Sequence, residues 1–118
     1  MGWHEQGDGK LMLGVNVVSG RIRDTPEVRL KTCLRMLVDR FDLDMILTPS
    51  QSLVLRNIAP ADRHTVEALL REHGVKMIDE VDAITRKSIA CPAFPLCGLA
   101  ITEVRVRVRV RVRVRVRV

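Results

Sequence analysis

The feature that most constrains the fold of this sequence is an apolar stripe at helical spacing between residues 30 and 41. The stripe consists of Leu30, Cys33, Leu34, Leu37, Val38 and Phe41. Charged residues occupy the opposite side, so the pattern predicts an amphipathic helix that packs on another layer. The preceding Thr25-Pro26-Glu27 has the composition of a helix start, with Thr as the N-cap, and we expect the helix to begin there.

Two β-rich regions flank this helix and predict the layer on which it packs. Residues 10–18 are rich in Val and Leu and are followed by turn residues at Ser19-Gly20. Beyond the helix, residues 45–47 and 53–55 are short apolar runs separated by the turn-prone residues 48–52. They predict two strands or one bent strand.

A second helix is predicted between Pro60 and Gly74. Proline is favoured at the first helical position, and glycine suits the left-handed conformation that follows a helix. Val66, Leu69 and Leu70 would form the buried side of this helix. The resulting order, β-α-β-β-α, predicts an α+β two-layer sandwich that is ferredoxin-like or half of such a fold.

The charge distribution separates the C-terminal tail from the rest of the chain. The 118 residues, enough for one small domain, carry a net charge of +6, but seven arginines lie in the Val-Arg alternation of Val104–Val118. Residues 1–103 contain 13 basic and 14 acidic side chains, a net charge of −1. Any attraction to nucleic acid or to an anionic membrane therefore belongs to the tail.

The alternation in this low-complexity tail would give an extended chain one valine face and one arginine face. A strand without a partner is not stable in water, so the tail by itself predicts no ordered element. Two origins stay open for so regular a sequence: translation of a hexanucleotide repeat, and an engineered tag.

Residue counts exclude several classes of protein. Aromatic side chains are limited to Trp3, Phe41 and Phe94, which excludes a surface that stacks nucleic-acid bases. Three cysteines do not make a disulfide framework, and the polar start MGWHEQGDGK does not resemble a signal peptide. No apolar run reaches the roughly 18–20 residues of a membrane-spanning helix. We expect a protein of a reducing compartment without a targeting segment.

The motif CPAFPLC is the strongest chemical signal in the sequence. Thiolates are the usual protein ligands of iron–sulfur clusters, and Pro92 and Pro95 would keep the segment from becoming a regular helix, so that Cys91 and Cys97 can face one cluster. The alternative is two buried cysteines that act as small apolar residues. A [4Fe–4S] cluster takes four cysteines, and Cys33 belongs to the apolar stripe. The motif therefore predicts at most half of a cluster site.

Basic side chains flank the predicted strand end and the cysteine motif. They are Arg21, Arg23, Arg86 and Lys87. Cations in this position would suit a cofactor with several carboxylates or an oxyanion substrate. Ordinary surface charge explains them equally well.

Three stretches together resemble one enzyme family. They are GWHEQGDGKLMLGVNVVSGRI, LTPSQSLVL and, most specifically, SIACPAFPLCGLAITE. These residues resemble the second repeat of the sirohaem-containing sulfite and nitrite reductases, and most of all the ferredoxin-dependent sulfite reductases of plants and cyanobacteria. The resemblance covers about residues 2–103.

The resemblance implies a fold, cofactors and partners. In that family a ferredoxin-like half-domain pairs with its counterpart from the first repeat, and a larger cluster-binding domain follows. A [4Fe–4S] cluster bridged to sirohaem delivers six electrons to sulfite or nitrite, with ferredoxin as the electron donor. Cys91 and Cys97 match the first two of four cluster ligands, and Thr48 and Gln51 match a turn that faces the sirohaem.

We accordingly expect residues 1–85 to form the half-domain, residues 86–103 to begin the sirohaem and [4Fe–4S] domain, and residues 104–118 to form the tail. The expected function is that of a fragment of a ferredoxin-dependent sulfite reductase, with nitrite reductase of the same family as the alternative. By itself the fragment would neither catalyse nor hold either cofactor stably, and it would self-associate. A small module whose tail binds nucleic acid or anionic membrane is a further alternative. The expected location is the bacterial cytoplasm or the plastid stroma.

Overall fold

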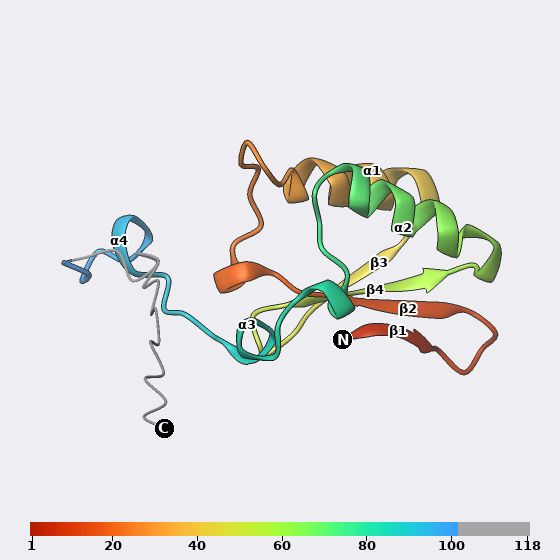
Figure 1. Cartoon of the computed structure of the whole chain (residues 1–118), viewed down its shortest axis with the longest axis horizontal. Coiled ribbons are helices and arrows are strands. Elements are labelled where there is room, and N and C mark those ends of the chain that lie inside the picture. The colour runs from red at the N-terminus through yellow and green to blue at the C-terminus, as the bar shows by residue number, and fades with distance from the viewer. Residues whose placement is uncertain (102–118) are drawn as a thin grey trace, which may run out of the picture.

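The computed structural model describes residues 1–101, so the predicted tail Val104–Val118 lies outside the described residues. Its centre is a four-stranded antiparallel sheet with the order β1-β2-β4-β3. The strands are β1 (Gly2–Glu5), β2 (Leu11–Val15), β3 (Asp44–Leu47) and β4 (Leu53–Ile58). Helices α1 (Leu30–Phe41) and α2 (Arg63–Glu72) lie side by side over one face of the sheet (Figure 1). The predicted α+β two-layer fold is confirmed.

Strand β1 was not predicted, because its residues lie in a polar, glycine-rich stretch. It pairs with β2 in a hairpin that places Trp3 opposite Leu13. The turn is closed by the Gln6 backbone N–H, which donates to the Lys10 carbonyl at 2.9 Å. The Gln6 side chain also bonds to Asn57 of β4, so the turn of the β1–β2 hairpin is attached to β4, which lies on the other side of β2 from β1.

The predicted start of the first helix at Thr25 is wrong, since α1 begins at Leu30. Thr25 instead closes a short turn, in which its backbone N–H donates to the Val28 carbonyl at 2.8 Å. The backbone N–H of Arg29 donates to the His73 carbonyl at 2.9 Å, which fixes the segment before the helix against the end of α2. The local bond of Thr25 and the tertiary bond of Arg29 take the backbone groups that an earlier helix start would have used.

Asp24 caps α1 from outside the helix. Its carboxylate accepts hydrogen bonds from the Thr32 backbone N–H at 3.1 Å and from the Thr32 hydroxyl at 2.8 Å. The bond from the Thr32 hydroxyl is the main reason that the pKa of Asp24 lies below its ordinary value. Asp24 therefore performs the function that the sequence assigned to Thr25.

The remaining elements follow their sequence signals. The predicted pair of strands forms the β3–β4 hairpin, in which Leu47 is paired with Leu53 across the turn. A short 3₁₀ turn at Pro60–Asp62 leads into α2, and Gly74 follows α2 with a φ of 75°, as its position predicted.

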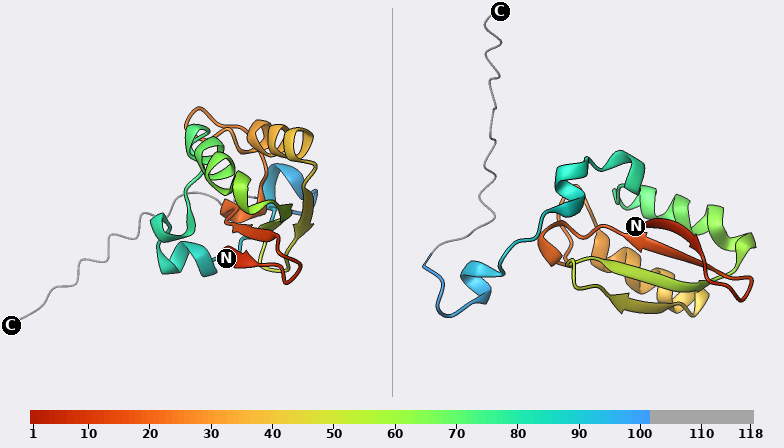
Figure 2. Two further views of the ribbon diagram at one scale, coloured as in Figure 1. Left: turned by 90° about the vertical axis from the view of Figure 1, so that its right-hand side faces the viewer. Right: turned by 90° about the horizontal axis from the view of Figure 1, so that it is seen from below.

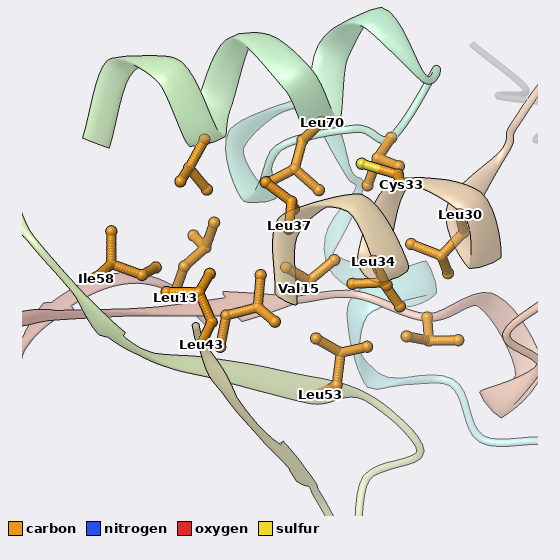
Figure 3. Close-up of a cluster of buried hydrophobic side chains, with 14 of the residues drawn as sticks. Leu13, Val15, Leu30, Cys33, Leu34, Leu37, Leu43, Leu53, Ile58 and Leu70 are labelled. Carbon is orange, nitrogen blue, oxygen red and sulfur yellow. The ribbon is translucent and has the colours of Figure 1, made fainter. Parts of the chain in front are cut away.

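Side chains from both layers form one hydrophobic core (Figure 3). Its most deeply buried members are Leu13, Leu37, Leu53, Leu55, Ile58, Leu70, Val66 and Cys33. The placement of Cys33 in the core confirms that it belongs to the apolar stripe, and burial raises the pKa of its thiol to about 11. Of the three residues predicted for the buried side of α2, Leu69 is only partly buried.

The chain after α2 first returns to the core and then leaves it. Val75 and Met77 are buried, whereas the short helices α3 (Ala83–Lys87) and α4 (Ala93–Leu96) contribute one buried side chain, that of Ala93. Figure 2 shows that α4 lies beyond the end of the sheet. No helix within residues 1–101 is long and apolar enough to cross a membrane.

Candidate functional site

The cysteine motif forms a single distorted turn with one thiol on each side. Cys91 precedes α4 and is exposed, and Cys97 follows it and is half-buried. The Cys97 backbone N–H donates to the Ala93 carbonyl at 2.8 Å and closes the turn, while Phe94 has an extended ψ of 141° inside it. The two thiols are therefore accessible, in contrast to the thiol of Cys33 in the core.

The turn between β3 and β4 is the second part of the site. The Thr48 hydroxyl accepts a hydrogen bond from the Ser52 backbone N–H at 3.1 Å and lies 3.0 Å from the Ser50 hydroxyl. Gln51 has a φ of 56°, which turns its side chain toward the segment that precedes Cys91. Thr48 therefore stabilises the turn, and Gln51 reaches out of it.

Gln51 contacts the cysteine segment through a reciprocal pair of hydrogen bonds. Its side-chain Nε2 donates to the Ala90 carbonyl at 2.7 Å, and its Oε1 accepts from the Ala90 backbone N–H at 2.8 Å. The Arg21 guanidinium donates to the carbonyl of Pro92. Side chains from two separate turns thus bond to the residues on either side of Cys91.

These segments enclose a cleft of about 310 Å³. Thr48 and Gln51 line it, together with Ala90 and Pro92, the neighbours of Cys91. The structure therefore brings the turn with Thr48 and Gln51 and the cysteine segment together at one end of the sheet. Cys91 and Cys97 themselves do not line the cleft, but their chain neighbours Ala90, Pro92 and Leu96 do. Of the flanking cations, Arg21 lines this cleft.

Ala90 was not singled out by the sequence, because it contributes only its backbone. Gly20 is a nearby residue that the sequence does show, and it lies close to Gln51: a Cβ added to Gly20 would be 3.0 Å from the Gln51 Cβ. A glycine at this position is thus explained by the Gln51 stem that packs against it.

The possible metal donors within residues 1–101 do not form a complete metal site. No cluster of three or more His, Cys, Asp or Glu side chains occurs in this part of the chain. The His73 Nδ1 lies 2.8 Å from the Leu69 carbonyl, and the His4 Nε2 lies 3.1 Å from the Met1 carbonyl. Cys91 and Cys97 have the chemistry and the accessibility of cluster ligands, but they supply two of the four thiolates that a [4Fe–4S] cluster takes.

The family model of the nitrite/sulfite reductase ferredoxin-like half domain matches residues 4–73, more than half of the chain. The chain belongs to the nitrite/sulfite reductase family. The matched residues run from the second half of β1 to the end of α2. They contain the other three strands, both long helices and the β3–β4 turn with Thr48 and Gln51.

Curated relatives in this reductase family carry sulfite reductase names. A "Sulfite reductase [ferredoxin]" from Synechococcus elongatus is 47% identical over 103 residues, which are 87% of this chain and 16% of that protein. A "Sulfite reductase [NADPH] hemoprotein beta-component" is 38% identical in Staphylococcus saprophyticus and 40% identical in a Shewanella species. In both cases 86% of this chain is covered and 18% of the relative. The chain thus spans less than a fifth of the length of these relatives.

Proposed function

We propose that this chain provides the ferredoxin-like half-domain and the first half of the cluster site of a ferredoxin-dependent sulfite reductase. The observation that carries this proposal is the 47% identity with the cyanobacterial ferredoxin-named enzyme, which exceeds the identity with the two NADPH-named relatives given above. The reaction of the intact enzyme would be the six-electron reduction of sulfite to sulfide. Reduction of nitrite by the same type of enzyme is the alternative.

In this proposal Cys91 and Cys97 are two ligands of a [4Fe–4S] cluster, and two further thiolates come from outside the present sequence. Cys33 cannot supply one of them, because it is fully buried between the helices and the sheet. When bound, the cluster and the neighbouring sirohaem transfer electrons to the substrate. Thr48, Gln51 and Arg21, on the cleft beside the cysteines, would face this cofactor region.

The proposed division of the chain is supported by its burial pattern. Residues up to Val81 still contribute to the packed unit, whereas large apolar side chains after residue 88 are exposed. The exposed fraction is 65% for Ile89, 67% for Leu96 and 94% for Leu99. Such residues are expected where a second unit begins and its own packing partners are not part of residues 1–101. We place the boundary of the half-domain near residue 85.

A second half-domain is the proposed structural partner. Within residues 1–101, β3 is paired only on its β4 side, and Met45, Ile46 and Leu47 are all exposed. An apolar edge strand favours association, so we expect the isolated chain to self-associate. Ferredoxin is the proposed electron donor, and the bacterial cytoplasm or plastid stroma, where ferredoxin is reduced, is the proposed location.

A chimeric enzyme tests this function. The segment of the Synechococcus elongatus ferredoxin-named relative that matches this chain is replaced by residues 1–101. Reduced ferredoxin and sulfite, or nitrite, are then supplied. We expect the chimera to show the absorbance of both cofactors and to reduce sulfite with a higher kcat/KM than nitrite.

Cysteine variants of the chimera provide the control. Cys91→Ser and Cys97→Ser should each abolish the cluster absorbance, whereas Cys33→Ala should leave it in place, because Cys33 lies in the core. The proposal fails if the chimera folds without a cluster, or if the cluster is retained in both serine variants. A preference for nitrite would favour the alternative substrate.

A further inference from the structure

We propose that Gln51 is a positioning residue, which fixes the backbone of the cysteine segment through Ala90 and so places Cys91. The inference rests on the proposed function only for the role of Cys91 as a ligand. Its basis is the pair of hydrogen bonds between the Gln51 amide and the Ala90 backbone, at 2.7 and 2.8 Å. This geometry engages both polar atoms of the side chain with the backbone N–H and C=O of one residue, and so with the two peptide units that flank its Cα.

The Gln51 side chain is itself held in place. The Gln51 backbone N–H donates to the Thr48 carbonyl at 3.2 Å, and the φ of Gln51 is 56°. The Cβ and Cγ atoms of Gln51 pack against Gly20. The turn that carries Gln51 is closed further by the bond between the Thr48 hydroxyl and the Ser52 backbone N–H. Because the side chain is held by the β3–β4 turn, its bonds to Ala90 fix the cysteine segment relative to the sheet.

Cys91 is held on its other side as well. The Arg21 guanidinium donates to the carbonyl of Pro92, and Arg21 follows directly after Gly20. Cys97 is linked to the same segment through its bond to the Ala93 carbonyl. The segment from residue 90 to residue 92 is therefore fixed at both ends by side chains of the half-domain, although none of its own side chains is buried.

The contact requires an amide of this length. A glutamate has the same shape, but its ionised carboxylate accepts hydrogen bonds and cannot donate to the Ala90 carbonyl. A protonated carboxyl group can do both, so Gln51→Glu should restore the pair of bonds at acidic pH, near the ordinary glutamate pKa of about 4.3. Gln51→Met keeps the apolar stem and removes both bonds.

The test is amide hydrogen exchange of the full chain, measured as the protection factor of the Ala90 N–H. We expect Gln51→Met to lower it about tenfold or more, since the amide then opens locally without global unfolding. Gln51→Glu should lower it at neutral pH and recover it as the pH falls toward about 4. A structural defect of the turn alone would not produce this pH dependence.

Gln6→Met is the matched control. The Gln6 side chain makes a similar pair of bonds to Asn57, at 2.9 and 3.0 Å. Gln6 belongs to the turn between β1 and β2, and this turn lies at the opposite end of the sheet from α4 (Figure 1). This variant should leave the Ala90 protection factor unchanged. A nitroxide label on Cys91, in a Cys97→Ala background, should become more mobile in Gln51→Met and not in Gln6→Met.

An Ala90 protection factor that stays within about twofold in Gln51→Met, or a label of unchanged mobility, would overturn the positioning role. These measurements need no cofactor. They therefore separate a failure of the positioning role of Gln51 from a failure of the proposed function, which the cluster absorbance of the chimera decides.

Discussion

Gly74 allows a direct test of how α2 is joined to the segment before α1. A Cβ added at this position would lie 2.2 Å from the Glu27 carbonyl oxygen, a separation that requires the backbone to move. The φ of 75° adds the cost of a left-handed conformation, about 1–2 kcal/mol for a residue with a side chain. Forced displacement in a packed region costs about 1–3 kcal/mol more. Gly74→Ala should therefore lower the free energy of unfolding by about 2–5 kcal/mol.

The matched control is Gly9→Ala. Gly9 has a similar φ of 83°, but a Cβ added there would meet no atom within 4 Å. This variant should lose only the conformational part, about 1–2 kcal/mol. Urea unfolding followed by far-ultraviolet circular dichroism measures both, with equal m-values as the sign that the unfolded states are comparable. Equal losses in the two variants would refute the assigned contact between Gly74 and Glu27.

Three further predictions concern the core, the buried thiol and the tail. Leu37→Ala truncates a fully buried side chain and should lower the free energy of unfolding by about 2–5 kcal/mol in the same assay. Met36 lies on the same helix but is 40% exposed, so Met36→Ala should lower it by less than about 1 kcal/mol. Similar losses in the two variants would contradict the burial pattern. Because burial raises the pKa of Cys33 from 9.0 to about 11, the unfolded chain binds fewer protons between these pH values, so stability should fall as the pH rises through this range. Cys33→Ala should remove that part of the pH profile, and an unchanged profile would exclude Cys33 as its source. The full chain should be retained on heparin in a salt-sensitive manner, and deletion of residues 104–118, which removes seven arginines, should abolish this retention. If the shortened chain is retained at the same salt concentration, the binding belongs to another surface.

The sequence predicted the fold class because its strongest patterns coincide with the buried residues. The stripe that contains Leu34 and Leu37 faces the core, and Gly74 follows α2 with a positive φ. Strand β1 was missed because its order comes from pairing with β2 and not from its own composition. The start of α1 was misplaced because Asp24, which lies before the predicted helix start, supplies the cap.

For the candidate site, the sequence could name the residue types and not their contacts. Cys91 and Cys97 were recognisable from their spacing and from family resemblance, and their role as cluster ligands stays a prediction. The turn with Thr48 and Gln51 was also recognisable. The bond from Gln51 to Ala90 was not, because it joins segments 39 residues apart through a backbone group that has no sequence signature.

The strand order β1-β2-β4-β3 has a consequence for folding kinetics. Each outer pair is a hairpin with a short loop, whereas the central β2–β4 pair joins segments on either side of α1. Hairpins form within microseconds, but closing the longer loop costs more entropy. We expect the meeting of the two hairpins to limit the folding rate. Truncation of Leu13 or Leu55, paired across this seam, would then slow folding, whereas truncation of Ile46 on the edge strand would mainly accelerate unfolding.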